Sequence, residues 1–399
     1  MKNTEQTVEN GNDRMNNTLL HRGGLLFALT AFFAASLLFL QGCGTGERTP
    51  VDPTVQTLAE TPTPAPTPEP QVLDGRTFFY DETDPSFTGL SCTAEDVTRI
   101  LDFLEDPVSA DLSDSDFSTE SQLELVGRFP ETDFIWNVDV FGTTVSSQAE
   151  TLDLNDTELP GIEALEELLP LFPHLLHVDM LNCPGEDEDI YQFTLRHPDT
   201  RFIWTAHLGV VALPTNITSF CRNIVYGGPT INDEYLDVQL RYFPDLIALD
   251  VGHGHHSITR CDWLQYAPKL EYLIIAICQI QDITPVGELK NLKYLEVFTN
   301  PGLTDISALG KLQNLKTLNI SNLEITDYTP LYSCKSLENC WILMNRIITD
   351  DQMAELQAAL PNCHFEHYYY PLFHPTTVGW RQLDAYFEMR DAFGAIYYQ

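Results

Sequence analysis

The chain has 399 residues, of which 43% are hydrophobic, so it is long and apolar enough to bury a sizeable core. Its 58 acidic and 21 basic residues give a formal net charge of −37. Such a charge repels phosphate backbones, and no basic stripe with interleaved aromatic residues offsets it, so the composition excludes nucleic-acid binding.

An uncharged apolar segment near the start of the chain predicts export and attachment to a membrane. A polar N-terminal region, residues 1–22, precedes 18 uncharged residues at 23–40. The sequence Leu40-Gln41-Gly42-Cys43 then resembles a bacterial lipobox, and the resemblance implies that Cys43 is acylated and becomes the mature N-terminus. If processing fails, residues 23–43 remain as a single membrane-spanning helix instead of a lipoprotein signal. In both cases we expect the rest of the chain on the extracellular face of the cell membrane.

The next segment, residues 44–74, predicts a stalk. It is rich in Thr and Pro, and between Thr61 and Pro70 proline occupies every second position. Proline at alternate positions forbids helix and sheet and favours an extended polyproline II conformation. We therefore expect a disordered stalk that holds a folded part away from the membrane.

Residues 75–150 are expected to form an N-terminal capping region for the folded part. Thr93 with Asp96 has the spacing of a capping box, and apolar residues occur at helical intervals at Val97, Ile100, Leu101 and Leu104. A solenoid needs such a cap because its terminal unit otherwise exposes its core.

Strands and helices are then expected to alternate. Residues 151–154 and 177–180 each predict a strand, and residues 162–169 predict a helix with an apolar face between them. A second internal sequence repeat, the internal echo, consists of residues 129–136 (FPETDFIW) and residues 197–204 (HPDTRFIW). Residues 361–365 form a degenerate third copy. We interpret each copy as the end of a helix followed by a strand.

The strongest pattern is a repeat within residues 151–371. Its first leucines follow one another at intervals of 24, 22, 23 and 22 residues, at Leu246, Leu270, Leu292, Leu315 and Leu337. This period is typical of leucine-rich repeats, in which alternating apolar residues such as Leu273 and Ile275 line the inner side of a short strand. One unit cannot bury this face alone, so we expect the units to stack into a curved parallel sheet.

Turn sequences such as Asp282-Ile283-Thr284-Pro285 resemble the internalin-like class of bacterial leucine-rich repeats. The buried turn asparagine of that class is present as Asn300 and Asn345, and Cys278 and Leu323 stand in its place in two other repeats. We therefore expect the ladder of asparagine hydrogen bonds between successive turns to be weaker at Cys278 and Leu323.

Residues 372–399 are expected to form a C-terminal cap. The order of parts and the tail, Gly379-Trp380-Arg381 followed by Tyr386-Phe387-Glu388-Met389-Arg390-Asp391, resemble a family of Gram-positive bacterial leucine-rich-repeat surface lipoproteins. The resemblance implies an α/β fold, a leucine-rich-repeat solenoid with helical N- and C-terminal caps behind a disordered stalk. It implies a location at the cell surface but no established ligand.

Residues that alternate with the core leucines point away from the core and form the predicted concave face, where aromatic and aliphatic side chains predominate. Exposed apolar patches commonly mark interaction surfaces, so a protein or peptide ligand is expected here. The alternative is that this face packs against the N-terminal region or a neighbouring molecule. The predicted ligand-binding residues are Tyr272, Ile274, Tyr294, Glu296, Phe298, Asn319 and Trp341.

No motif for catalysis or for a cofactor is present, so we expect a binding protein and not an enzyme. The loop at 252–257 (GHGHHS) carries His253, His255 and His256, which leaves a metal-dependent hydrolase as a remote alternative, although adjacent loop side chains rarely converge on one ion. An envelope scaffold that assembles with itself is the other alternative. The nine cysteines show no zinc spacing, which favours free core thiols, with disulfides still possible.

Overall fold

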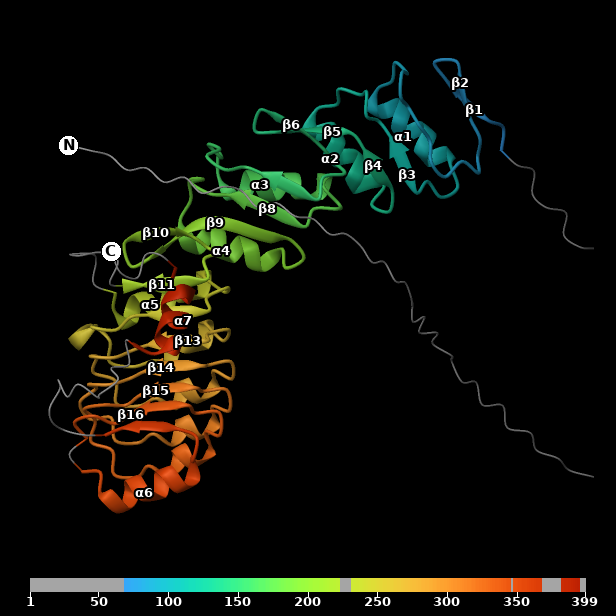
Figure 1. Ribbon diagram of the computed structural model, residues 1–399. Coiled ribbons are helices and arrows are strands. Elements are labelled where there is room, and N and C mark those ends of the chain that lie inside the picture. Colours follow the sequence, from blue (N-terminus) through green and yellow to red (C-terminus); the bar gives the residue numbers. More distant parts are fainter. Residues whose placement is uncertain (1–67, 223–230, 346, 368–381, 395–399) are drawn as a thin grey trace, which may run out of the picture. The chain divides into compact units, whose positions relative to one another are not determined.

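A computed structural model describes residues 68–222, 231–345, 347–367 and 382–394, which belong to one compact unit (Figure 1). The predicted membrane segment 23–43, Cys43 and most of the predicted stalk 44–74 lie outside the described residues. Within the described parts, no helix is both long enough and apolar enough to cross a bilayer.

The first part of the described chain contains short strands and two helices. Strands β3 and β4 pair in parallel, whereas β1 with β2 and β5 with β6 form antiparallel hairpins. The predicted capping box is confirmed, because the Thr93 side chain accepts from the Asp96 backbone N–H at the start of α1. The elements are β1 (Gln71–Leu73), β2 (Arg76–Phe78), α1 (Ala94–Phe103), β3 (Ser109–Asp111), α2 (Thr119–Arg128), β4 (Asp133–Ile135), β5 (Asn137–Val140) and β6 (Thr143–Ser146).

A four-stranded sheet of order β10-β9-β8-β7 comes next along the chain. Strands β7, β8 and β9 run parallel, and β10 returns antiparallel to β9. The strands predicted at 151–154 and 177–180 and the helix between them are confirmed. The elements are β7 (Thr151–Asp153), α3 (Ile162–Leu168), β8 (His177–Met180), α4 (Asp187–Arg196), β9 (Arg201–Leu208) and β10 (Val211–Pro214).

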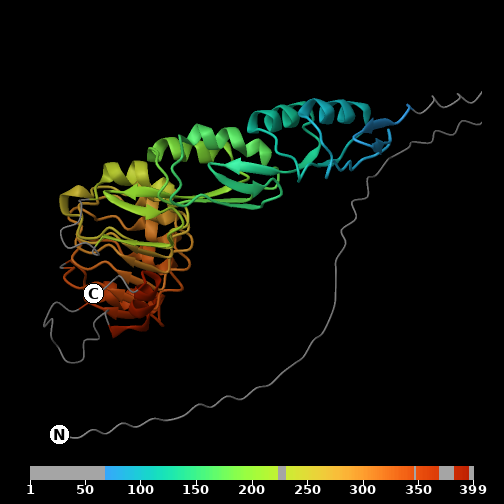
Figure 2. The same cartoon turned by 90° about the horizontal axis from the view of Figure 1, so that it is seen from above.

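The second sheet contains seven parallel strands in chain order, as expected of a leucine-rich-repeat solenoid (Figure 2). Its strands are β11 (Ser219–Cys221), β12 (Ala248–Asp250), β13 (Tyr272–Ile274), β14 (Tyr294–Glu296), β15 (Thr317–Asn319), β16 (Asn339–Trp341) and β17 (His364–Glu366).

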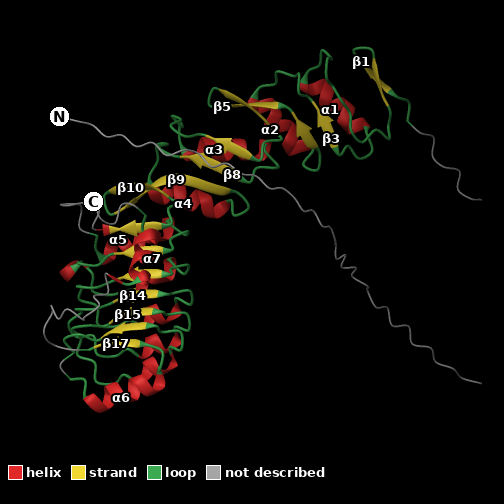
Figure 3. Ribbon diagram, in the orientation of Figure 1, coloured by secondary structure: helices red, strands yellow, loops and turns green. Residues whose placement is uncertain are grey.

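The repeats return between these strands through α-helices or short 3-10 helices (Figure 3). These are α5 (Asp233–Gln239), η3 (Leu240–Tyr242), η5 (Asp262–Tyr266), η6 (Thr284–Glu288), η7 (Ser307–Lys311), η8 (Thr329–Ser333) and α6 (Asp350–Ala359). A last helix, α7 (Asp384–Ala392), lies after β17 in the chain.

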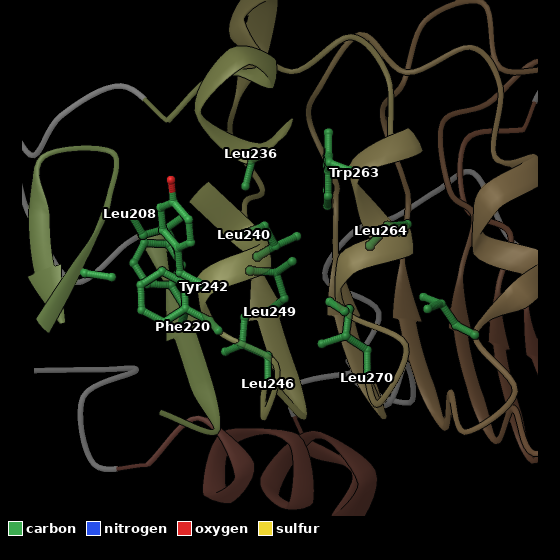
Figure 4. Packing of buried hydrophobic residues seen from close by; sticks show 14 of the residues in the cluster. Leu208, Phe220, Leu236, Leu240, Tyr242, Leu246, Leu249, Trp263, Leu264 and Leu270 are labelled. Atoms are coloured by element: carbon green, nitrogen blue, oxygen red, sulfur yellow. The ribbon is translucent and has the colours of Figure 1, made fainter. Parts of the chain in front are cut away.

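The main core is one cluster of buried side chains that extends from Phe78 to Phe365. The central residue of each strand lies in it, so Leu249, Leu273, Leu295 and Leu318 stand beside one another in register. Figure 4 shows the same cluster continuing across the boundary between the two sheets. Its members there are Leu208, Phe220, Leu240, Tyr242 and Leu249. A single repeat could not bury this apolar face by itself.

The turn asparagines act as expected. The fully buried Asn300 donates to the carbonyl oxygens of Ile275 and Val297, at 3.0 and 2.8 Å, and accepts from the N–H of Ile280 at 3.0 Å. At the equivalent position the Cys278 sulfur has long contacts of 3.5 and 3.8 Å to carbonyl oxygens. The ladder is therefore weaker at Cys278, as predicted from the sequence.

The internal echo is a structural repeat. Helices α2, α4 and α6 all end in the same way, with C-cap φ and ψ of −123° and 66°, −122° and 63°, and −128° and 69°. A strand comes after each of them, namely β4, β9 and β17. In the first two copies the tryptophan backbone N–H bonds a hydroxyl eleven residues further on, with Trp136 bonding Ser147 at 3.1 Å and Trp204 bonding Thr215 at 3.2 Å.

The repeat region expected at 151–371 is divided into two sheets. Strand β10 occupies the edge of β9, where the next parallel strand would otherwise pair, so β11 begins a new sheet. Strand β10 is not predicted from the sequence, because its four residues, Val211–Pro214, carry too little periodicity to distinguish a strand from a loop.

Seven described cysteines are free thiols, and burial raises the pKa of all seven: Cys92, Cys183, Cys261, Cys278, Cys334, Cys340 and Cys363. It raises the pKa of Cys334 to about 11 and that of Cys363 to about 12, and holds the pKa of Cys340 well above its usual range. Because the thiolate is the reactive form, we expect iodoacetamide at pH 8 to spare these three in the native chain and to react first with the half-buried Cys92 and Cys183. Mass spectrometry of alkylated peptides, with and without urea, checks this. Native labelling of Cys340 as fast as that of Cys92 would contradict it.

Candidate binding face on the second sheet

Two rows of side chains cross the outward side of the second sheet, away from the main core. The first residues of its strands form the first row: Ser219, Ala248, Tyr272, Tyr294, Thr317, Asn339 and His364. The third residues form the second row: Cys221, Asp250, Ile274, Glu296, Asn319, Trp341 and Glu366. We call these two rows the strand face. The central residue of each of these strands lies in the main core, and side chains alternate across a strand. The predicted residues Tyr272, Ile274, Tyr294, Glu296, Asn319 and Trp341 therefore lie on the opposite side of the sheet.

The expected exposure of this face is wrong. The whole second row is buried, including Ile274 at 5%, Glu296 at 6%, and Asn319 and Trp341 at 2%. Tyr294 is buried as well, whereas Tyr272 and Phe298 are half-buried. Whether these residues bind a ligand stays a prediction, but they do not form an open surface in this state of the molecule.

Helix α7 covers the part of the strand face that β11–β14 supply (Figure 1). Its buried residues Tyr386, Met389 and Phe393 form a second apolar cluster, separate from the main core. Their partners in the strands include Cys221, Ala248, Ile274, Ala276 and Tyr294. The predicted C-terminal cap, residues 372–399, therefore contains a helix, but that helix packs on the strand face and not over the last repeat.

Small side chains make room for α7. Ala248 is fully buried in the first row and Cys221 is buried in the second row, so a helix can approach these strands closely. The hydroxyl of Ser219 lies 3.5 Å from the carbonyl oxygen of Phe393, just after the end of the helix. The spacing of Tyr386, Met389 and Phe393 at i, i+3 and i+7 is the sequence signal for this docking, because it places all three on one side of a helix.

Polar groups dominate the other end of the strand face. His364 Nε2 lies 2.9 Å from Glu366 Oε1, and Asn319 Oδ1 accepts from the backbone N–H of Ser321 at 3.1 Å. The hydroxyl of Thr317 and the indole N–H of Trp341 are buried, and the described residues provide no hydrogen-bond partner for either. A buried polar group without a partner costs free energy, so this end of the face is not optimised for packing alone.

The histidine loop has an ordinary structural role. His253, His255 and His256 are exposed, and the rings of the first two lie 6.3 Å apart. Gly254 is required by packing, because a Cβ there would lie 2.4 Å from Ile258 Cγ1. Among the residues that the structure describes, no group of three or more His, Cys, Asp or Glu side chains could hold a metal.

A pocket of about 280 Å³ lies beside β9, near the boundary between the sheets. Asp245 contacts Arg201 Nη2 at 2.6 Å and Lys269 Nζ at 2.7 Å. Arg241 pairs with Glu188. The lining combines three cations with aromatic rings: Arg201, Arg241, Lys269, Tyr191, Phe202, Trp204 and Tyr242. Because each cation already contacts a carboxylate, we assign this pocket to packing where the two sheets meet.

Comparison with known proteins does not assign the chain to a family. No family model matches the chain, and no curated protein resembles it. Among solved structures, internalin C2 of Listeria monocytogenes is 21% identical, with a TM-score of 0.34 over 58% of this chain and 87% of that one. An internalin F of the same species is 16% identical, with a TM-score of 0.31 over 62% of this chain and 74% of that one.

A leucine-rich-repeat protein of Leptospira interrogans is 14% identical, with a TM-score of 0.30 over 67% of this chain and 74% of that one. At TM-scores this low, the assignment of a leucine-rich-repeat fold rests on the pairing of the seven parallel strands and on the buried leucine and asparagine positions, not on these resemblances.

Proposed function

We propose that the chain is a membrane-anchored, extracytoplasmic leucine-rich-repeat protein that binds a protein or peptide ligand through its strand face. The observation that carries the proposal is α7. The apolar side of this helix packs on the strand face, where Met389 is fully buried and Tyr386 and Phe393 are nearly so. The inward-facing central residues of strands β11–β17 lie in the main core. The repeats therefore bury their own core without the apolar surface that α7 covers.

Site-specific photo-crosslinking in intact cells tests the proposal. A benzophenone amino acid would replace Asn339, which is half-buried in the first row on β16, away from the α7 cluster. The matched control replaces Tyr235 on α5, which is 36% exposed and outside the strand face. We expect a discrete adduct with another protein from position 339 and none from 235. The reverse pattern would contradict binding at the strand face, and an adduct only between two copies of this chain would favour a scaffold.

The proposed anchor gives a second prediction. If Cys43 is the lipidation site, Cys43→Ser should block processing and leave a precursor longer than the mature chain by the 42 residues that precede Cys43. Electrophoresis of the membrane fraction and labelling with a fatty-acid analogue check this. If the variant and the natural chain have the same size and neither takes up label, the anchor is the membrane-spanning helix of residues 23–43 instead.

A further inference from the structure

Helix α7 occupies the surface on which the proposed ligand would bind, and this shows which kind of ligand fits. We propose that the partner of the strand face is an amphipathic helix that takes the place of α7, and that α7 holds the face closed until such a helix displaces it. The inference rests on the proposed function and deepens it, because it names the class of ligand and the control of access.

The contacts of α7 define the anchors that a ligand helix needs. Tyr386, Met389 and Phe393 lie at i, i+3 and i+7 and are 5%, 0% and 2% exposed, whereas Phe387 on the other side of the helix is 47% exposed. Recognition of a helix in a groove through anchors at this spacing is a recurring mode of peptide binding. A ligand should therefore present two aromatic residues around a flexible apolar one such as methionine.

Charge does not narrow the class of ligand. The second row carries the carboxylates of Asp250, Glu296 and Glu366, which are buried, and the whole chain has a net charge of −37. Helix α7 nevertheless packs on this face with three carboxylates, at Asp384, Glu388 and Asp391, and one guanidinium, at Arg390. The apolar anchors, and not the net charge, therefore define the ligand helix.

The fold permits α7 to leave. Its anchors belong to an apolar cluster that is separate from the main core, so the repeats keep their own packing without it. Seventeen residues separate the end of β17 at Glu366 from the start of α7 at Asp384. Extended, they could span roughly 55 Å, whereas five strand spacings of about 4.8 Å separate β17 from β12. The connection is long enough for α7 to leave the face without disturbing β17.

While α7 is attached, it competes at an effective concentration that depends on the length of its connection, on the order of millimolar for a short linker. A ligand helix at micromolar concentration must overcome this competition. A substitution that releases α7 should therefore strengthen binding of a helix added in solution, and this effect distinguishes a displaceable occupant from a permanent part of the fold.

The test uses the full chain and a fluorescein-labelled peptide of residues 382–394. Fluorescence polarisation would compare the natural chain with Met389→Asp, which places a carboxylate at a fully buried anchor, and with Phe387→Asp as the matched control on the exposed side. We expect Met389→Asp to bind the peptide at least tenfold more tightly than the natural chain, and Phe387→Asp to behave as the natural chain. The same peptide carrying Met389→Asp should bind weakly to all three.

Equal affinity of all three chains for the peptide would overturn the inference that α7 closes the face, while leaving binding at the strand face possible. No measurable binding by any of them would overturn the assignment of a helical ligand, while the crosslinking at position 339 would still judge the proposed function. Circular dichroism would verify that Met389→Asp keeps the repeats folded. Tyr386→Ala, a milder change at a neighbouring anchor, provides a second release variant with the same expected direction.

Discussion

Replacing Asn300 by alanine is expected to lower the free energy of unfolding by about 3–5 kcal/mol, because three backbone groups lose their partner inside the core. The carbonyl oxygens of Ile275 and Val297 and the N–H of Ile280 all bond this one side chain, which is fully buried. Urea unfolding followed by circular dichroism measures the effect.

The matched control is Asn314→Ala. This side chain is exposed and donates to the carbonyl oxygen of Lys290 at 2.8 Å, so the same chemical change should cost less than about 1 kcal/mol there. Equal losses at the two positions would show that the asparagine ladder does not stabilise the turns.

A cavity in the core of the second sheet should lower the free energy of unfolding by a similar amount, but it should destabilise only the strands of that sheet. Leu318→Ala on β15 removes a fully buried side chain that stands between Leu295 and Cys340, so we expect a loss of about 2–5 kcal/mol. In a solenoid each repeat contacts only its neighbours, and β10 interrupts the backbone hydrogen bonding between β9 and β11.

Hydrogen–deuterium exchange should therefore detect faster exchange in β13–β17 of Leu318→Ala while β7–β9 keep their protection. Leu195→Ala, at a position 55% exposed, is the control and should leave both sheets unchanged. Simultaneous loss of protection in both sheets would mean that the side chains crossing the boundary, such as Leu208 and Phe220, couple the sheets into one folding unit.

The sequence predicts those parts of the fold that depend on local periodicity. The alternation around Leu273 and Ile275 identifies the strand and its inward side, and the capping box at Thr93 identifies the start of α1. The echo at 361–365 correctly anticipates β17, although only a few residues match. In each case the physical reason is contained within one repeat.

Features that depend on contacts between distant segments are not predicted. The spacing of Tyr386, Met389 and Phe393 indicates a helix with an apolar side, but not the surface on which that side packs. Tyr386 and Ile274 are 112 residues apart, so their contact does not follow from the periodicity of either segment. The direction of the side chains in the candidate site follows from the strand pattern, but their burial depends on packing against segments distant in the sequence, such as α7. The same limitation applies to β10, whose pairing with β9 divides the repeat region.

One titration tests most directly whether α7 and its ligand share the strand face. The labelled peptide of residues 382–394 would be titrated into Met389→Asp and into the same variant carrying Ala248→Glu. Ala248 lies in the first row, in the cluster that α7 forms with the strands, so a glutamate there faces the vacated surface and not the main core. We predict that Ala248→Glu weakens binding of the peptide at least tenfold. Unchanged affinity would contradict the account, because it would place the bound peptide somewhere other than the strand face.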